Sequence, residues 1–410
     1  MTGRVIVVTG ASSGLGYEVA RYLCEGGNDV ILACRNEEKA NRAIEKIKRT
    51  NPNALATYMN LDLADLASVR KFVDDFHETG KKLHTLINNA GIACNFKDPK
   101  KQYTTDNFEA TMGTNHLGHY LLTNLLLEDL KKVGTDGEDA RIVTVTSSMH
   151  DPESMKRRNK AVRDLVAMDL ENVLLLNEDS YNGLQAYKNS KAANLMFTYE
   201  LARRLEGSGV TANAVCPGFV PSTDLMRSAS GAQKFFCRYV LHGMLRFAKI
   251  TRTINQGAMA ICNLATDEKY KEISGKYFKD AQETKSSEET LDEEKQKKLW
   301  ELSGGYCKMD GYEPIDVPPP PPPEEEKKEE EKKEEEKKEG EEEKKEGEEE
   351  EKKDGEGEEK KEEEVAKEEE KEEKKEEETK EEEKKEEKEE IKEEEKKEEE
   401  TKTESEEKKE

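Results

Sequence analysis

The stretch "VVTGASSGLG", residues 7–16, decides the fold. It continues the apolar run "VIVV" and then opens a segment with helical spacing. Glycines between the two let the backbone turn tightly and approach a pyrophosphate, which the free N–H groups of a helix N-terminus can hold. A glycine-rich turn alone can also be purely structural. The residues expected at the phosphates are Gly10, Ser12, Ser13, Gly14, Leu15 and Gly16.

Seven short β-rich runs alternate with helix-length segments up to about residue 277. They are "RVIVVT", "DVILAC", "ATYMNLD", "HTLINNA", "RIVTVTS", "TANAVCPG" and "SGKYF". Strands separated by helices favour right-handed βαβ units and a parallel sheet covered on both faces. Since "VIVV" and "IVTV" are almost continuously apolar, these strands should be buried on both sides. The sequence therefore predicts one doubly wound α/β domain over residues 1–312, with its first glycine turn at the first strand.

The last quarter of the chain differs sharply from the rest. A proline-rich linker at 313–323 precedes a tail at 324–410 that carries 50 acidic and 26 lysine residues, hence −24 of the formal net charge of −25. Closely spaced Glu and Lys support a solvated single helix, whereas four glycines and the lack of apolar residues favour disorder. We leave that choice open, and the partner of the tail is unknown. Because 1–323 is nearly neutral, the overall charge says nothing about the partners of the folded part.

The cysteines and the N-terminus indicate a reducing, cytoplasmic environment. Seven cysteines are widely spaced, without a CxxC pair, and most lie in apolar runs, which predicts buried thiols rather than disulfides or a zinc site. The apolar run near residue 1 is too short for a signal peptide, and no run reaches membrane-spanning length. His116, His119 and His150 lack a further ligand at suitable spacing, so we expect no metal. Nothing indicates nucleic-acid binding.

The residues after the second and third strands bear on which nucleotide binds. An acid after the second strand would accept the ribose hydroxyls, whereas a base would pair with a 2′-phosphate. Arg35 stands there, and the first acid is Glu37, which favours NADP(H) over NAD(H). Arg35 could instead be a solvated surface residue. Asp62, with Leu63 beside it, follows the third strand and should accept from the adenine amino group, or else cap the next helix.

Tyr187 and Lys191 lie one helical turn apart in "QAYKNSKAAN", residues 185–194. A phenol with a pKa near 10 exchanges protons poorly at neutral pH, and a nearby cation would favour the phenolate. In isolation the pair is more simply explained as a core tyrosine beside an exposed lysine. The surrounding motifs reverse this preference.

Six motifs in one order resemble the short-chain dehydrogenase/reductase family. They are "TGASSGLG", "NNAG" at 88–91, "GTNHLGHYLLTNLLL" at 113–127, "VTVTSSMH" at 143–150, "AYKNSKAAN", and "CPGF" at 216–219. The agreement covers about residues 3 to 305 and is greatest with the microsomal and photoreceptor retinol dehydrogenases. The resemblance implies a Rossmann-type fold and NADP(H)-dependent hydride transfer between nicotinamide and a carbonyl/alcohol pair. We expect a lipophilic substrate, either retinal and retinol or another aldehyde or ketone.

The resemblance also assigns roles to residues of this chain. It makes Tyr187 the general acid/base, Lys191 the group that holds the ribose and lowers the tyrosine pKa, Ser148 the group that holds the substrate oxygen, and Asn115 the anchor of a relay water. Either serine of the Ser147–Ser148 pair could simply satisfy backbone groups. Further cofactor contacts implied are Asn89, Ala90, Gly91, Pro217, Gly218, Val220 and Ser222, with Thr223 a neighbouring candidate. The family also suggests a homodimer through the helices bearing Asn115 and Tyr187.

Two segments should determine the small-molecule substrate. Residues 151–163 are basic and lengthen the interval between Ser148 and Tyr187. A long insertion at this place is similar to the protochlorophyllide oxidoreductases and suggests C=C reduction as an alternative. Residues 231–249 place Phe236, Val240, Met244 and Phe247 on one helical stripe with basic residues around it. This segment is a substrate lid, a peripheral membrane contact or an ordinary packed helix. A different hypothesis makes the acidic tail the functional part, as a spacer or interaction arm on a cofactor-binding module.

Overall fold

The computed structural model describes residues 3–93, 100–152, 164–176, 181–218, 220, 252–279 and 281–319. These residues belong to one unit, Met1–Pro321. The predicted tail at 324–410 lies outside the described residues.

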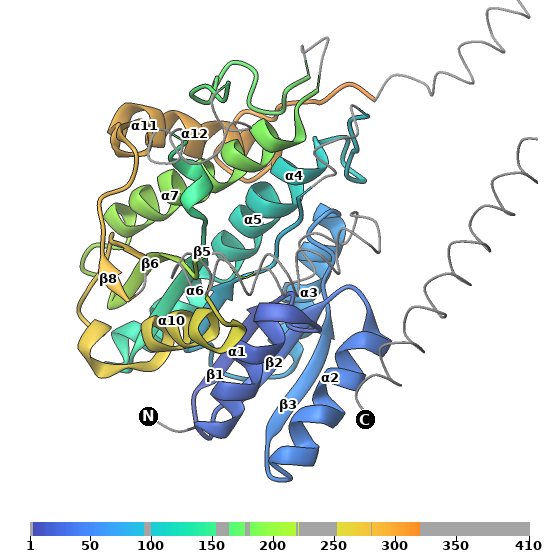
Figure 1. Cartoon of the computed structure of the whole chain (residues 1–410), viewed down its shortest axis with the longest axis vertical. Helices are drawn as coiled ribbons and strands as arrows, with labels where there is room; N and C mark the ends of the chain where they lie inside the picture. The colour runs from blue at the N-terminus through green and yellow to red at the C-terminus, as the bar shows by residue number, and fades with distance from the viewer. Residues whose placement is uncertain are drawn as a thin grey trace, which may run out of the picture. The chain divides into compact units, whose positions relative to one another are not determined.

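The elements follow one another in βα alternation (Figure 1). The strands are β1 (Val5–Thr9), β2 (Asp29–Cys34), β3 (Leu55–Asn60), β4 (Thr85–Asn88), β5 (Ala140–Val145), β6 (Val210–Cys216), β7 (Tyr277–Lys279) and β8 (Gln282–Glu283). The helices are α1 (Gly14–Glu25), α2 (Glu37–Thr50), α3 (Leu66–Glu78), α4 (Ala110–Met112), α5 (Gly118–Leu125), α6 (Leu127–Thr135), α7 (Gly183–Arg204), α10 (Ile254–Thr266), α11 (Glu288–Leu291) and α12 (Glu293–Tyr306). Short turns are the π-helical η1 (Gly113–Leu117) and the 3₁₀ turns η2 (Ser148–His150) and η6 (Glu268–Tyr270).

The eight strands form one sheet in the order β3-β2-β1-β4-β5-β6-β7-β8. Strands β1 to β7 pair in parallel, and β8 adds an antiparallel edge. The doubly wound α/β fold and all seven predicted strands are therefore confirmed. Strand β8 was not predicted because its two residues are polar and exposed, so no apolar run marks it.

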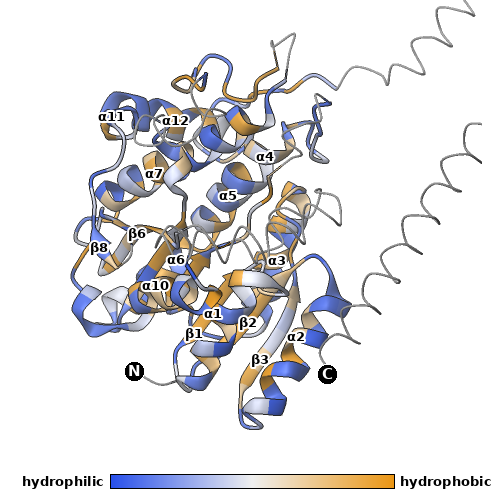
Figure 2. Cartoon of the chain, viewed as in Figure 1, coloured by the Kyte–Doolittle hydropathy of each residue, from blue (hydrophilic) through white to orange (hydrophobic). Residues whose placement is uncertain are grey.

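Helices cover both faces of the sheet, as expected for strands buried on both sides. Along β1 the side chains alternate: Val7 joins one core with α3, α5, α6, α7 and α12, whereas Ile6 and Val8 join the other with α1, α2 and α10. Figure 2 shows the hydrophobic colouring of β1 and β2 and the hydrophilic α11. The result is a three-layer domain in which the sheet is the rigid scaffold.

Helix α12 packs onto α5 and α7 through an aromatic cluster. The Trp300 ring lies 5.0 Å from that of Tyr120 on α5 and stacks at 5.6 Å on Phe197 of α7. The Trp300 indole also donates to the Tyr312 hydroxyl at 2.7 Å. Backbone pairing continues past Tyr312, since Ile315 N donates to Gly305 O at 3.1 Å. The C-terminal part of the domain thus covers α5, which follows the turn η1 with Asn115, and α7, which carries Tyr187.

A buried ionic cluster joins the start of β5 to the end of α10. Arg141 donates to both carboxylate oxygens of Asp139, at 2.8 and 2.6 Å, and to the carbonyls of Leu264 and Asp267 at 2.9 and 2.8 Å. Arg4 pairs with the same carboxylate at 3.1 Å. Both arginine side chains are nearly inaccessible. The cluster satisfies carbonyls at the C-terminus of α10 and fixes that helix against the sheet.

No helix in the described segments is long and apolar enough to cross a membrane. Five cysteines fall within these segments, Cys24, Cys34, Cys216, Cys262 and Cys307, and all are free and buried, as the sequence predicts.

Replacement of Arg141 by methionine should destabilise the protein strongly. The change removes the hydrogen bonds to the carbonyls of α10 and leaves Asp139 with less compensation in a buried setting, which costs about 3–5 kcal/mol of unfolding free energy. Urea denaturation of Arg141→Met measures this loss. The matched control is Arg49→Met, whose exposed side chain should change stability by less than about 0.5 kcal/mol. Equal effects of the two substitutions would contradict the role given to the cluster.

Candidate active site

The glycine-rich turn lies between β1 and α1 and is tightly packed against the end of β4. Gly10 and Gly14 have φ of 68° and 54°, a conformation that side chains other than glycine rarely adopt. A Cβ on Gly10 would lie 2.9 Å from Cβ of Ala90, and one on Gly16 would lie 2.5 Å from the Asn89 amide and from Gly10 O. The turn therefore requires glycine at each of these positions, and it brings the predicted Asn89 and Ala90 beside the predicted glycines.

The N-terminus of α1 is suited to an anion. Its N-cap, Ser13, has an extended backbone and makes no side-chain hydrogen bond to the first turn of the helix. The adjacent Ser12 contacts the thiol of Cys34, whose pKa burial raises to about 11. First-turn N–H groups that no side chain caps, next to a backbone without Cβ atoms, fit the pyrophosphate of a dinucleotide.

Arg35 and Asp62 leave the same edge of the sheet, since β2 and β3 pair in parallel up to Cys34 and Asn60. Arg35 is exposed and forms no ion pair within the described part of the chain. The half-buried Asp62 carboxylate accepts a hydrogen bond from Ala64 N at 3.0 Å. Asp65 caps α3 instead, so the helix-cap alternative for Asp62 is wrong. Leu63 beside it is buried under α5.

Asn115 lies at the centre of the π-helical turn η1. A π-turn inserts one residue into a helix and changes the direction of the side chains around it. The Asn115 side chain accepts from Ile92 N at 2.8 Å and donates to Ile92 O at 2.9 Å and to Ser190 Oγ at 3.1 Å. A Cβ on Gly91 would lie 3.5 Å from both Asn115 Oδ1 and Lys191 Nζ. The backbone after β4 thus lies beside both side chains.

Tyr187 and Lys191 lie on one face of α7, as predicted, and both are buried. The Lys191 ammonium is 5.7 Å from the Tyr187 ring centroid and donates to Val145 O at 3.2 Å. The Ser190 hydroxyl donates to Tyr187 O at 2.9 Å, and Thr146 Oγ1 donates to Lys191 O at 2.8 Å. These two hydroxyls, which the sequence did not single out, fix the backbone of α7 at the site.

Burial dominates the electrostatics of the pair. It raises the pKa of Tyr187, and the hydrogen bond with Ser147 opposes that rise. Burial lowers the pKa of Lys191 to about 8. The Lys191 ammonium bonds to Val145 O, and its predicted effect on the tyrosine pKa stays a prediction. Ser147 is the neighbour that stabilises the phenolate.

The structure brings Ser147 rather than Ser148 to Tyr187. Ser147 continues β5 with an extended backbone, and its hydroxyl lies within hydrogen-bonding reach of the Tyr187 phenol. Ser148 is the first residue of the 3₁₀ turn η2. Successive side chains of an extended segment point to opposite faces, so only one of the two can face α7. The expectation for Ser148 is therefore corrected, and strand alternation counted from β5 is the signal that could have found Ser147.

Pro217, Gly218 and Val220 follow β6 and close the site from the side of α10. Gly218 has φ of 79°, and Val220 is buried. A Cβ on Gly257 of α10 would lie 3.1 Å from both Val220 and Leu15 and 3.2 Å from Pro217 O. The chain after β6 is thus packed against the residue that follows Gly14 in the phosphate turn.

Several predicted features lie outside the described residues. They are Ser222, Thr223, the segment 231–249 and most of the segment 151–163. The structure therefore describes the cofactor side of the site more fully than its substrate side.

The three histidines near the site are packed residues. His116 lies in η1, His119 in α5 and His150 in η2, as expected for helix and loop positions. Burial lowers the pKa of His116 to about 4 and that of His119 to about 3, so both rings are neutral. Across the segments that the structure describes, no group of acidic, histidine or cysteine side chains is arranged to hold a metal ion.

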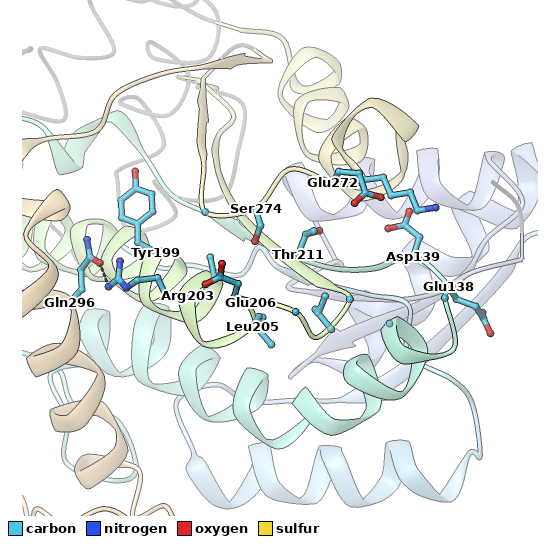
Figure 3. A pocket seen from close by; sticks show the side chains of 18 of the residues that line it. Glu138, Asp139, Tyr199, Arg203, Leu205, Glu206, Thr211, Glu272, Ser274 and Gln296 are labelled. Carbon is cyan, nitrogen blue, oxygen red and sulfur yellow. Dashed lines mark hydrogen bonds between the residues drawn. The ribbon is translucent and has the colours of Figure 1, made fainter.

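An open depression lies at the opposite edge of the sheet (Figure 3). Asp139, Thr211 and Ser274, near the starts of β5, β6 and β7, line it together with Tyr199 of α7. Parallel strands place their starts and ends at opposite edges, so this depression is separate from the residues around Tyr187. None of the predicted site residues lines it.

The comparisons with known proteins identify the family. The model of the short chain dehydrogenases matches residues 4–156 and 176–234. Retinol dehydrogenase 11 of Homo sapiens is 38% identical over 317 residues, covering 77% of this chain and 88% of that protein. Polyprenol dehydrogenase of Homo sapiens is 38% identical over 310 residues, or 75% and 85% of the two chains. The chain belongs to the short-chain dehydrogenase family, whose members are oxidoreductases that bind a nicotinamide cofactor, and it is similar to the retinol dehydrogenases.

Other relatives and solved structures agree with the fold. The chloroplastic short-chain dehydrogenase TIC 32 A of Brassica napus is 36% identical over 301 residues, covering 72% of this chain and 86% of that one. An uncharacterised protein of Mycobacterium paratuberculosis superposes with a TM-score of 0.56 at 30% identity, covering 77% of this chain and 96% of that chain. Levodione reductase superposes with a TM-score of 0.53 at 19% identity, covering 72% and 99%, which supports the fold alone.

Proposed function

We propose that the protein transfers a hydride between NADP(H) and a lipophilic carbonyl/alcohol pair. The observation that carries this proposal is the convergence of Tyr187, Lys191 and Ser147 beside Asn115, at the edge of the sheet where the glycine-rich turn lies. A phenol, a cation and a hydroxyl brought together in a buried setting form a proton-transfer site.

Each residue has a distinct part in reduction. The bound cofactor would supply the hydride to the carbonyl carbon. The Tyr187 phenol gives its proton to the carbonyl oxygen, and the Ser147 hydroxyl donates a hydrogen bond to the same oxygen. Lys191 holds the cofactor ribose, and Asn115 holds the water through which Tyr187 regains its proton. In the oxidation direction Tyr187 accepts the alcohol proton instead.

The cofactor choice rests on Arg35. Its exposed guanidinium follows β2 directly, where an acid would select the ribose hydroxyls, and it forms no ion pair within the described segments. A 2′-phosphate would gain a charge-assisted hydrogen bond from it. Asp62 and Leu63 would line the adenine, and Pro217, Gly218, Val220 and Ser222 the nicotinamide.

The substrate class rests on two supports. The relatives named after retinol and polyprenol act on lipophilic alcohols, and the apolar stripe of 231–249 suits such a molecule as a lid. A peripheral membrane contact through the same segment and a cytoplasmic location complete the proposal. A homodimer through α5 and α7 is also part of the proposal. Because α12 packs against α7, the second subunit would have to contact the parts of α5 and α7 that α12 does not cover.

Substitutions at the site should separate the two serines. Tyr187→Phe removes the proton donor and should lower kcat with NADPH and an aldehyde by on the order of 100-fold to 10,000-fold. Ser147→Ala should lower kcat by on the order of 100-fold, because it removes one hydrogen bond to the developing charge. Ser148→Ala is the matched control, and its kcat should stay close to that of the parent protein. Steady-state kinetics on the full chain, with retinal and other aldehydes and ketones, gives these values. A larger loss in Ser148→Ala than in Ser147→Ala would overturn the assignment.

Reversal of the charge at Arg35 should change the cofactor preference. Arg35→Asp loses the ion pair with the 2′-phosphate and gains an acceptor for the ribose hydroxyls, so kcat/KM should fall for NADPH and rise for NADH. We expect a change in the ratio of the two values on the order of 100-fold, from the 1.5–3 kcal/mol of a charged hydrogen bond. Arg42→Asp, on the exposed face of α2, is the control. An unchanged ratio in Arg35→Asp would rule out this basis for NADP(H) selection.

A further inference from the structure

A buried histidine connects two parts of the site that the proposed mechanism treats separately. Thr9 ends β1, and its hydroxyl accepts from the backbone N–H groups of Asn89 and Ala90, both at 2.9 Å. His119 on α5 is 2% exposed, with Nε2 2.8 Å from Thr9 Oγ1 and Nδ1 2.9 Å from Asn115 O. One imidazole thus spans the distance between the turn after β4 and Asn115.

The direction of every hydrogen bond follows from the atoms involved. A backbone carbonyl only accepts, so Nδ1 of His119 carries the proton and donates to Asn115 O. Both acceptor positions of the Thr9 hydroxyl are taken by N–H groups, and its single proton is left for Nε2, since Ile87 O is farther away at 3.4 Å. Burial lowers the pKa of His119 to about 3, so the ring is neutral and Nε2 keeps its lone pair.

The contacts close into a ring around the turn after β4. Asn115 holds the backbone of Ile92 through both its amide oxygen and its amide nitrogen. The turn 89–92 is therefore fixed at one end by Thr9 and at the other by Asn115, and His119 joins these two anchors. Without His119 the backbone carbonyl of Asn115 loses its link to Thr9, and of the contacts in this ring only those of the Asn115 side chain still join η1 to the turn.

We propose that His119 is a positioning residue that fixes the backbone carbonyl of Asn115 relative to the 89–92 turn beside the cofactor. The inference rests on the proposed function, in which the cofactor lies along that turn and Asn115 holds a water of the proton relay. His119 acts through Asn115 and does not touch the substrate. Its loss should lower kcat and leave the KM for the carbonyl compound unchanged.

Three substitutions in the full-length protein distinguish the contributions of the two hydrogen bonds that the His119 imidazole makes. His119→Asn keeps a donor near the position of Nδ1, so it can still hold Asn115 O. His119→Gln keeps an acceptor near the position of Nε2 and loses the bond to Asn115 O, and His119→Phe loses both bonds. We expect kcat to fall on the order of 100-fold in the Gln and Phe variants, since a misplaced group costs about that much, and to stay within about 5-fold in the Asn variant. Steady-state kinetics with NADPH and a carbonyl substrate, paired with thermal melting, gives both readouts.

The controls and the contrary outcomes are distinct. His77→Asn and His77→Gln change an exposed histidine of α3 and should leave kcat unchanged. A merely structural role for His119 would lower the melting temperature of its variants without separating Asn from Gln in kcat, and that result overturns the inference. If His119→Phe does not fold, the comparison of Asn with Gln decides alone. Absence of turnover in the parent protein overturns the proposed function and this inference with it, whereas normal turnover with equal kcat in both amide variants overturns this inference only.

Discussion

The pairing of β1 with β2 on one side and with β4 on the other is the constraint on which the site depends. The strand order reverses there, and in open α/β sheets ligands bind outside the carboxyl ends of the strands at such a point. Each of the elements around that edge supplies one group. Gly10 follows β1, Asn89 follows β4, Ser147 follows β5 and Pro217 follows β6. The sheet thereby assembles residues that are up to two hundred positions apart in the chain.

Burial then gives these groups their chemical character. Removing an ammonium group from water costs free energy, so burial disfavours the charged form of Lys191. The hydrogen bond to Val145 O offsets part of this cost. Such a cation gains from any ligand that brings hydroxyls or negative charge, as the ribose and phosphates of a dinucleotide do. The histidines nearby stay neutral for the same reason, so they add hydrogen bonds without adding charge. A bound dinucleotide would thus compensate part of the cost of burying the Lys191 charge.

The fold and most of the site could be predicted from the sequence because their signals are local. Apolar runs marked the seven parallel strands, glycines marked the phosphate turn, and the spacing of Tyr187 and Lys191 placed both on one face of α7. Ser147 and His119 could not be assigned in this way. The choice between Ser147 and Ser148 depends on which face of β5 meets α7, and the bonds of His119 join β1 to α5 across the core. Strand alternation shows that Ser147 and Ser148 point to opposite faces, but which face meets α7 and which residues His119 bonds are tertiary facts.

Isotope transfer tests hydride delivery to a carbonyl most directly. The full-length protein would be incubated with NADPH deuterated at the nicotinamide C4 position, in each stereochemical form, and with retinal as an unsaturated aldehyde. Mass spectrometry and NMR of the product locate the label. Reduction of the carbonyl predicts one deuterium on the carbinol carbon with one of the two forms. Deuterium on an alkene carbon, or no enzyme-dependent transfer to retinal or to simpler aldehydes and ketones, would contradict it.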